Sequence, residues 1–473
     1  MPICYYYKHN WNMEYGICMN LTLQVHWENE WHDAGIVRFL KPENGLLGDP
    51  FFSYDTRYTV NALEYLGDFN AENLIDKTAV GVNLPCHFGG DYLNGEIAPV
   101  LRDIIPQGAS RRLWVKMMGY SRDPEQTIDT RLLSEGCIAP IGNLRIKEAA
   151  EAFAERLAAA EPAVRFTREQ VCRRADNLIE HAHNLGIAIG GATGAGGDAP
   201  KLLMVETHDG DFALEGTVAE AEVKEHWLVK FPRGRKTEAD INVLKGEAAI
   251  YKTLEQRNFD SIKNTRIDER DGEYALWMPR FDREVVDGVI VRYGVESIYS
   301  MMGKIGDGAA LVHTDILKAL IEKTTKPQAK DALLADYLAR DLLNFAVGNK
   351  DNHGRNTALI KRGKDIELAP AYDVAPMVLD PEGIAMTTRW PRELLQLNGE
   401  PNYVGIVVKY AGDLELATDL LRDHLVKLDN MTEALRRNGA PKAMLNAGGL
   451  KLNLAGEVLM ALNTLIEGGP APR

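Results

Sequence analysis

Alternating apolar and polar residues mark several short strands near the start of the chain. They run over 21–27, 35–41, 51–54 and 79–84, and turn-forming residues separate them. Because a period of two places successive side chains on opposite faces of a sheet, this pattern predicts a small β-rich module. The alternation begins only at Leu21, so residues 1–18 are interpreted as an extension ahead of the module.

A helical pattern follows the strands. Residues 146–160 are rich in alanine and glutamate, and Pro162 ends the run. Thr167 and Gln170 have the spacing of a capping box, which predicts the start of another helix. Helices therefore separate the β-rich module from the remainder of the chain.

From residue 186 the pattern changes to short apolar runs around a glycine cluster. Strands are predicted over 186–190, 201–205 and 226–231, and a helix is predicted over 238–255. After Pro279 the pattern is almost wholly helical to the C-terminus, apart from one hairpin over 357–368. This second half of the chain is thus expected to pair a sheet with a helical region.

The length supports a division into three parts. With 473 residues, the chain exceeds the usual size of one domain. We predict an α+β fold with a β-rich module plus helices at 1–180, a β-sheet lobe at 181–283 and an all-helical lobe at 284–473.

Composition narrows the function classes. Hydrophobic residues make up 45% and charged residues 26%, which is typical of a soluble globular protein. The net charge of -14 argues against a protein that coats nucleic acid. The five cysteines form no CxxC pair, so neither a disulfide framework nor a zinc module is indicated. Without an apolar run of membrane-spanning length or a secretory signal, a cytoplasmic location is expected, with no membrane partner.

Three acidic or amide side chains are predicted to converge in the second half. Gly348 ends a helix, so Asp351 lies on a loop, and Asn356 precedes the hairpin. Because a hairpin brings its open ends together, Asn356 and Asp373 are expected at the same end. This is the arrangement in which protein kinases place an acid beside the substrate hydroxyl and two oxygens on Mg²⁺. The alternative interpretation is that these residues only form turns, as Asp and Asn often do.

The preceding residues offer a phosphate-binding arrangement. Glycines between two strands, including Gly194, Gly196 and Gly197, let backbone N–H groups approach a phosphate, although a plain surface loop has the same composition. Lys230 shares a strand face with an apolar neighbour and therefore needs a partner. Glu247 is beside the apolar stripe of the 238–255 helix and can supply it, unless both charges are simply solvated.

Taken in order, these elements resemble the HipA-type serine/threonine kinase family, the toxin component of bacterial toxin–antitoxin pairs. The matching segments are 196–201, 227–232, 246–247, 280–283, 347–356 and 368–374, with 52–58, 83–85 and 103–108 in the N-terminal module. The resemblance implies a bilobal protein-kinase-like fold that uses ATP and Mg²⁺. It implies catalytic roles for Asp351, Lys230 and Glu247, and nucleotide binding by Gly194, Gly196, Gly197, Lys201, Lys230, Met278, Phe281, Asn356 and Asp373, with Asn356 and Asp373 as the metal ligands.

The resemblance also implies partners. These are a protein substrate connected with translation, such as an aminoacyl-tRNA synthetase or another translation factor, and a small DNA-binding antitoxin of HipB type. DNA is then contacted only through that antitoxin. Thr193 is the hydroxyl nearest the glycine loop and is predicted as an autophosphorylation site. Pro279 departs from the family pattern, since proline offers no N–H to adenine.

Three other interpretations compete with a protein kinase. Residues 194–199 fit a dinucleotide-binding fingerprint, but a strand follows them where that motif needs a helix. A kinase-like scaffold that acts through an antitoxin complex is the non-enzymatic alternative, although Lys230, Asp351 and Asp373 are all retained. A small-molecule kinase would use the same phosphate-binding groups.

Overall fold

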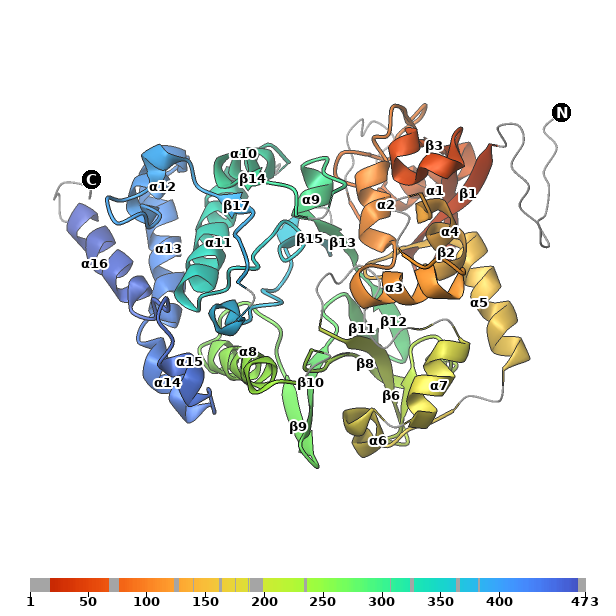
Figure 1. Cartoon of the computed structure of the whole chain (residues 1–473). Helices are drawn as coiled ribbons and strands as arrows, with labels where there is room; N and C mark the ends of the chain where they lie inside the picture. The colour runs from red at the N-terminus through yellow and green to blue at the C-terminus, as the bar shows by residue number, and fades with distance from the viewer. Residues whose placement is uncertain are drawn as a thin grey trace.

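The structure is a computed structural model of the chain (Figure 1). It describes residues 18–67, 76–122, 127–138, 140–160, 164–174, 176–185, 187, 199–233, 236–306, 308–323, 327–362, 366–381 and 383–466. The predicted strand at 186–190 and the glycines that follow it lie outside the described residues, apart from Ile187.

The N-terminal module is built on a five-stranded sheet of order β4-β3-β2-β1-β5. Its strands are β1 (Met19–Trp27), β2 (Glu30–Phe39), β3 (Phe51–Tyr54), β4 (Asp91–Tyr92) and β5 (Leu144–Ile146). Its helices are η1 (Pro42–Gly48), α1 (Thr56–Leu66), α2 (Ala98–Ile104), α3 (Gly108–Met117), α4 (Asp129–Arg131) and η2 (Leu132–Gly136). The strands predicted from the first three alternating runs are therefore confirmed.

The prediction of a strand at 79–84 is wrong. This segment turns back on itself, with one isolated bridge between Gly81 and Leu84. Two of its backbone groups bond to the C-terminal lobe: Val82 N donates to Glu296 at 2.7 Å, and Ala79 O accepts from Lys361 Nζ at 3.0 Å. The segment thus fastens the N-terminal module to that lobe, a tertiary use that local alternation does not reveal.

A second five-stranded sheet, of order β7-β6-β8-β10-β9, forms the middle lobe. Its strands are β6 (Lys201–Thr207), β7 (Phe212–Leu214), β8 (Val223–Lys230), β9 (Arg266–Arg270) and β10 (Glu273–Pro279), with η3 (Glu220–Glu222) between β7 and β8. The predicted strands at 201–205 and 226–231 are confirmed by β6 and β8.

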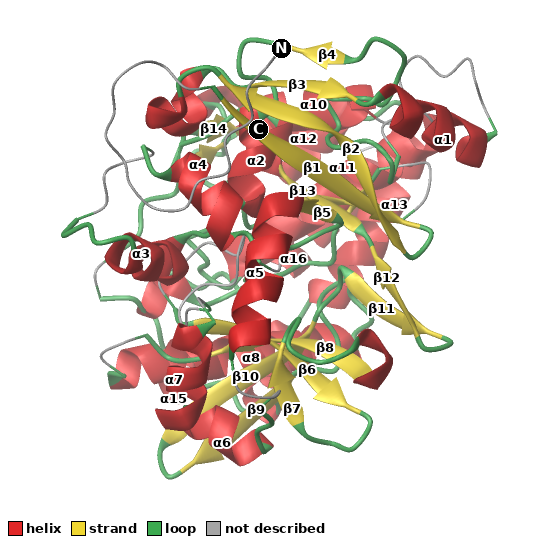
Figure 2. Cartoon of the chain, turned by 90° about the vertical axis from the view of Figure 1, so that its right-hand side faces the viewer, coloured by secondary structure: helices red, strands yellow, loops and turns green. Residues whose placement is uncertain are grey.

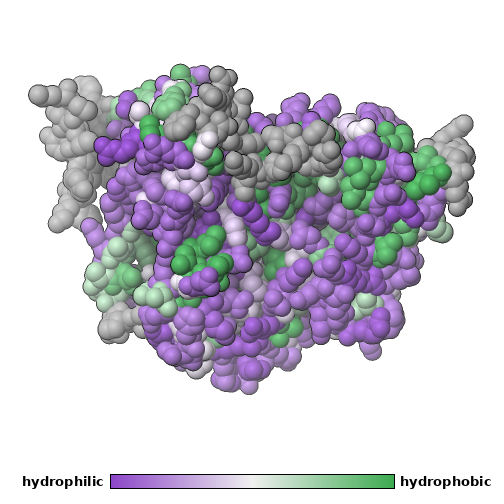
Figure 3. All heavy atoms as spheres, turned by 180° about the vertical axis from the view of Figure 1, so that it is seen from behind, coloured by the Kyte–Doolittle hydropathy of each residue, from purple (hydrophilic) through white to green (hydrophobic). Residues whose placement is uncertain are grey.

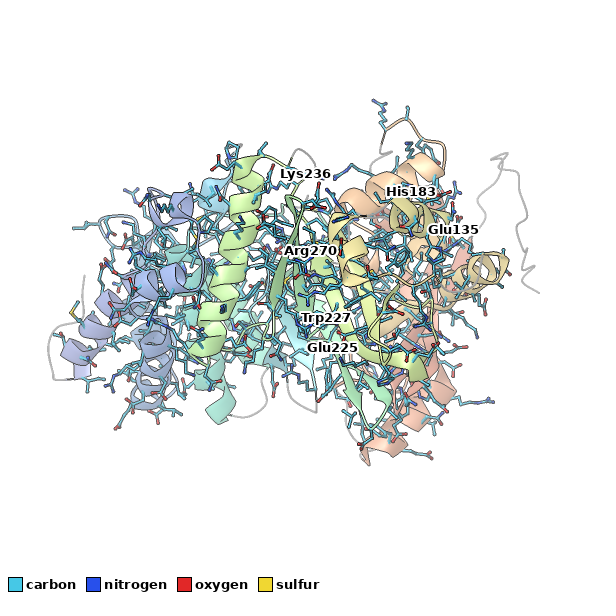
Figure 4. The ribbon with its side chains drawn as sticks, turned by 90° about the horizontal axis from the view of Figure 1, so that it is seen from below. Glu135, His183, Glu225, Trp227, Lys236 and Arg270 are labelled. Carbon is cyan, nitrogen blue, oxygen red and sulfur yellow. The ribbon has the colours of Figure 1, made fainter. Side chains whose placement is uncertain are left out.

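Helices cover both faces of this sheet. On one face lie α5 (Lys147–Ala159), α6 (Arg168–Arg173) and α7 (Asp176–Asn184), and on the other lies α8 (Glu238–Gln256). Figure 4 shows Trp227 in the sheet and His183 on the α7 side. Figure 2 shows α5 running from the N-terminal sheet to the middle sheet. Ala149 of this helix packs in the core of the N-terminal sheet, and Phe153 packs in the core of the middle sheet. The predicted helices at 146–160 and 238–255 and the capping box of Thr167 are confirmed.

The C-terminal lobe is mainly helical. Its helices are α9 (Ile298–Met301), α10 (His313–Lys323), α11 (Pro327–Ala346), η4 (Met377–Leu379), η5 (Arg392–Leu394), α12 (Tyr403–Tyr410), α13 (Leu414–Leu428), α14 (Met431–Arg437), α15 (Lys442–Leu445) and α16 (Leu454–Ile466). The predicted hairpin is present as β15 (Ala358–Lys361) and β16 (Glu367–Leu368), which pair antiparallel.

The prediction that the lobe at 284–473 is all-helical is wrong, because the region after Pro279 also contains strands that were not predicted. They are β11 (Arg283–Val286), β12 (Val289–Arg292), β13 (Gly294–Ser297), β14 (Leu311–Val312) and β17 (Thr388–Arg389). β11 and β12 form a hairpin whose turn is Asp287 and Gly288, both with positive φ. An Asp-Gly pair between β-branched runs is a strong hairpin signal, so this element was visible in the sequence.

The face of the molecule seen from behind is mainly polar (Figure 3). Seen from behind, the hydrophobic residues form small, separate patches (Figure 3). No helix within the described ranges is both long and apolar enough to cross a membrane. The three-part division at 1–180, 181–283 and 284–473 stays a prediction.

Candidate active site

Lys230 is buried at the end of β8, on the sheet face that α8 covers. Its neighbours Trp227 and Val229 belong to the core on the opposite face, as the alternation of a strand requires. Lys230 Nζ donates to Glu247 Oε2 at 2.6 Å. This confirms the predicted pairing of the strand lysine with the helix glutamate.

Glu247 is held in place by the packing of α8. The predicted apolar stripe of this helix faces the sheet and consists of Ile241, Leu244, Ala248 and Tyr251. Gly246 allows close approach to the C-terminal lobe, since a Cβ there would lie 2.6 Å from the Pro376 side chain. Glu247 is consequently fully buried, with the Tyr251 hydroxyl 3.5 Å from its Oε1.

Asp373 joins this lysine from the C-terminal lobe. Lys230 Nζ donates to Asp373 Oδ1 at 2.6 Å, and Lys201 Nζ lies 3.9 Å from Asp373 Oδ2. Asp373 has a φ of 53°, and Asn349 Nδ2 donates to its carbonyl oxygen at 3.0 Å. A left-handed conformation at a non-glycine residue persists only where surrounding contacts impose it, and such residues cluster at functional sites.

Burial and charge act against each other in this cluster. Burial opposes ionisation of Asp373, but the ammonium groups of Lys201 and Lys230 outweigh it and hold the pKa of the carboxyl well below its usual value. Burial likewise disfavours the Lys230 cation, yet Asp373 and Glu247 raise the pKa of Lys230 above its usual value. Burial dominates at the other two groups: it lowers the pKa of Lys201 and raises that of Glu247. Lys230 and Asp373 are therefore firmly charged.

Asp351 lies on the loop that follows α11, as predicted. Its backbone N–H donates to Asn349 Oδ1 at 3.2 Å, and its carbonyl oxygen accepts from Asn356 Nδ2 at 2.8 Å. Burial raises the pKa of the Asp351 carboxyl; the nearby Asp373 raises it further, while His353 and the two lysines oppose the shift. The Asp351 carboxyl is thus a stronger base than an exposed aspartate.

The predicted site residues that the structure describes line one cleft between the lobes. Its two cavities share Lys201, Lys230, Glu247 and Asp373. The first has about 610 Å³ of empty space, its open mouth included, and is also lined by Asp351. The second has about 760 Å³ on the same measure and is also lined by Met278, Phe281 and Asn356. Asn356 and Asp373, predicted at the same end of the hairpin, therefore border the same cavity.

The second cavity has an apolar part. Met278 packs with α8 and the sheet on the cavity side, and Phe281 stacks on Tyr372 at 5.4 Å between ring centroids. Trp277 belongs to the core on the other face, and of residues 277–281 only Met278 and Phe281 line the cavity. Pro279 pairs with Trp227 at the end of the β8–β10 ladder.

Four predicted residues lie outside the described ones. They are Thr193, Gly194, Gly196 and Gly197. Lys201, which closes the same motif, is the first residue of β6 and is buried in the cleft.

Other residues at the cleft were not singled out by sequence reasoning. Asn349 contacts both Asp351 and Asp373. Arg233 of the middle lobe forms an ion pair with Asp380 of the C-terminal lobe at 2.6 Å. Asp103 of the N-terminal module lines the apolar cavity. The sequence indicated Asn349 through its position between the helix-ending glycine and Asp351. No local pattern in the sequence indicates the Arg233–Asp380 ion pair.

Two lobes that enclose a cleft lined by a paired lysine and glutamate and by several acidic side chains are typical of kinase-like bilobal folds. A family model described as "HipA-like C-terminal domain" matches residues 193–431, just over half of the chain. The chain belongs to this family.

Comparison with solved structures supports the fold. One match is to HipA of the Shewanella oneidensis toxin–antitoxin system, in a complex with HipB and its operator DNA. The TM-score is 0.60 at 16% identity, and the match covers 94% of this chain and 99% of that one. This confirms the predicted bilobal α+β fold.

A second structural match is to the Helicobacter pylori proinflammatory kinase CtkA. It has 13% identity and a TM-score of 0.33, and covers 55% of this chain and 97% of that one. That score is too low to support an argument about the fold. No curated protein matches the sequence.

Proposed function

We propose that this protein is an ATP- and Mg²⁺-dependent serine/threonine protein kinase. The observation that carries the proposal is the contact of Lys230 with both Glu247 and Asp373 in a cleft that Asp351 and Asn356 also line. A lysine held by a helix glutamate, opposite a metal-binding aspartate, is the phosphate-positioning arrangement of protein kinases. Membership of the HipA-like family supports the same activity.

The residues have separate roles in this proposal. Lys230 binds the nucleotide phosphates and is oriented by Glu247, and Lys201 adds a second positive charge. Asp351 orients the hydroxyl of the substrate and accepts its proton as the γ-phosphate is transferred. The apolar cavity with Met278 and Phe281 receives the adenine ring.

The side chains present fit a magnesium site. Asn356 Nδ2 is used by the Asp351 carbonyl, which leaves the amide oxygen of Asn356 as an acceptor, and Asp373 is held ionised. One carboxylate and one amide oxygen, completed by phosphate and water oxygens, are the ligands that Mg²⁺ prefers. When bound, Mg²⁺ would neutralise the charge on the phosphates.

The biological setting is proposed from the relatives. The Shewanella oneidensis match is a HipA from a toxin–antitoxin system, and its structure contains HipB and operator DNA. We infer that this chain acts as the toxin of such a pair, binds a small DNA-binding antitoxin, contacts DNA through it and works in the cytoplasm. Its substrate is proposed to be a translation protein such as an aminoacyl-tRNA synthetase.

Transfer of labelled phosphate tests the proposal. The purified chain, incubated with γ-labelled ATP, Mg²⁺ and a cell extract, should label protein on serine or threonine. Nucleotide binding without any transfer would favour the scaffold alternative, and label appearing only in small molecules would favour a small-molecule kinase.

The activity should fall on acidification at a higher pH than the usual aspartate value would give. Asp351 accepts a proton only when ionised, and its pKa is raised by burial. The activity is therefore present above this raised pKa and lost as the pH falls through it. A pH profile of the initial rate at saturating ATP measures the effect.

The control is the pH profile of the residual activity of an Asp351→Asn variant. Since burial also raises the pKa of Glu247, protonation of Glu247 contributes an acid limb that persists in this variant. An acid limb of the same position and depth in both proteins would contradict the role of Asp351.

Autophosphorylation at Thr193 remains part of the proposal. A phosphate there would add negative charge close to the nucleotide phosphates and should reduce ATP binding. Intact-mass analysis after incubation with Mg²⁺ and ATP should show one added phosphate that a Thr193→Ala variant lacks. Absence of that mass in an active preparation would remove Thr193 from the account.

A further inference from the structure

A carboxylate of the N-terminal module contacts the catalytic loop of the C-terminal lobe. Asp103, near the end of α2, accepts hydrogen bonds from Ser297 N at 2.8 Å and Ser297 Oγ at 2.7 Å. Arg355 Nη1 lies 3.4 Å from Asp103 Oδ1. The side chains of Asp103 and Arg355 are 15% and 3% exposed, so this ion pair is largely shielded from water.

Arg355 is fixed at both of its ends. Its guanidinium lies over the Tyr299 ring, 5.4 Å from the centroid, while its backbone carbonyl accepts a hydrogen bond from the Tyr372 hydroxyl. Tyr372 directly precedes Asp373, and Arg355 directly precedes Asn356. The two proposed metal ligands are thus joined through the residues that precede them.

Asn356 depends on this loop for its orientation. Its backbone N–H donates to His353 O at 2.8 Å and its Nδ2 donates to Asp351 O at 2.8 Å. Both partners belong to the same short loop, which contains no helix or strand. The contact between Asp103 and Arg355 anchors this loop to the N-terminal module.

Asp103 itself is an unsuitable metal ligand. Its two oxygens already receive three donors, from Ser297 and Arg355. The Arg355 guanidinium beside this carboxylate disfavours a second cation there. The contact between Asp103 and Arg355 is therefore the route by which Asp103 acts on the metal site.

We propose that Asp103 is a positioning residue for the metal site, so that the N-terminal module completes the nucleotide-binding cleft of the C-terminal lobe. By fixing Arg355, Asp103 sets the position of Asn356. The inference rests on the proposed function, because it takes Asn356 and Asp373 as the Mg²⁺ ligands. Groups that orient metal ligands typically contribute about 10- to 100-fold to metal affinity.

Calorimetric titration with the non-hydrolysable ATP analogue AMP-PNP tests the proposal. The full chain and an Asp103→Asn variant are each titrated in excess Mg²⁺ and in EDTA. We expect the variant to bind AMP-PNP about 10-fold more weakly in Mg²⁺ and equally well in EDTA. The EDTA titration also reports whether the variant is folded.

A Glu296→Gln variant is the matched control. Glu296 is a buried carboxylate at the same interface, but its partners among the described residues are Val82, Ser300 and Lys361, none of which belongs to the catalytic loop. Its response to Mg²⁺ should match that of the wild type.

The outcomes separate this inference from the proposed function. A wild-type affinity that does not respond to Mg²⁺ overturns both. If Mg²⁺ strengthens AMP-PNP binding equally in the wild type and in Asp103→Asn, only the positioning role is overturned. The positioning role is also overturned if Asp103→Asn loses as much affinity in EDTA as in Mg²⁺, or if Glu296→Gln loses as much affinity in Mg²⁺ as Asp103→Asn.

Discussion

Replacing Asp351 with asparagine should reduce the rate of phosphoryl transfer by about 100- to 10,000-fold, the usual contribution of a positioned general base. Asparagine keeps the shape of the side chain but cannot accept the hydroxyl proton. The backbone contacts of Asp351 with Asn349 and Asn356 do not involve its carboxylate, so the loop should keep its conformation. Labelled transfer and AMP-PNP binding, measured on the same preparation, separate catalysis from binding.

Asp315→Asn is a suitable control because Asp315 is exposed on α10 of the same lobe. This control should transfer phosphate at the wild-type rate. Wild-type transfer by Asp351→Asn would show that another group accepts the proton, and equal loss of AMP-PNP binding would show that Asp351 has a structural role instead.

Replacing Lys230 with methionine should abolish transfer and destabilise the protein by about 3–5 kcal/mol, the usual result of removing one partner from a buried ion pair. The substitution leaves Glu247 fully buried without its cation, and Asp373 with only the more distant Lys201 among the contacts described. Urea unfolding followed by tryptophan fluorescence measures the loss, because Trp227 and Trp277 are buried in the same sheet.

A second substitution tests the reason for this loss. Lys230→Met combined with Glu247→Leu removes both charges of the pair and should recover most of the stability while remaining inactive. Lys224→Met is the control on the same strand: its side chain is 54% exposed and its partner Glu206 is largely buried, so the loss of this pair should cost less than the loss of the fully buried Lys230–Glu247 pair. Equal destabilisation by Lys230→Met and Lys224→Met would contradict the account.

Local patterns were sufficient to predict much of this site. The alternation in β8 identified the face of Lys230, and the stripe along α8 placed Glu247 beside it. The glycine stop after α11 and the short hairpin brought Asp351, Asn356 and Asp373 to the same cleft. Each inference needed only the period of one element and the geometry of one turn.

Features that depend on distant partners were not predictable in this way. Asp103 and Arg355 are 252 residues apart, and nothing in either local segment indicates the pairing. The 79–84 segment alternates like a strand, yet Glu296 and Lys361 bind its backbone in a turn. The β11–β12 hairpin is different, since its Asp287-Gly288 turn was a readable signal that was missed.

The central claim is that Lys230, Asn356 and Asp373 surround a metal-bound nucleotide within reach of Asp351. A crystal structure of the full chain with AMP-PNP and Mn²⁺, read from the anomalous signal of the metal, tests it most directly. The account predicts one Mn²⁺ bound by the Asn356 and Asp373 side chains, with Lys230 on the phosphates and adenine beside Met278 and Phe281. A metal or nucleotide bound away from these side chains would contradict it.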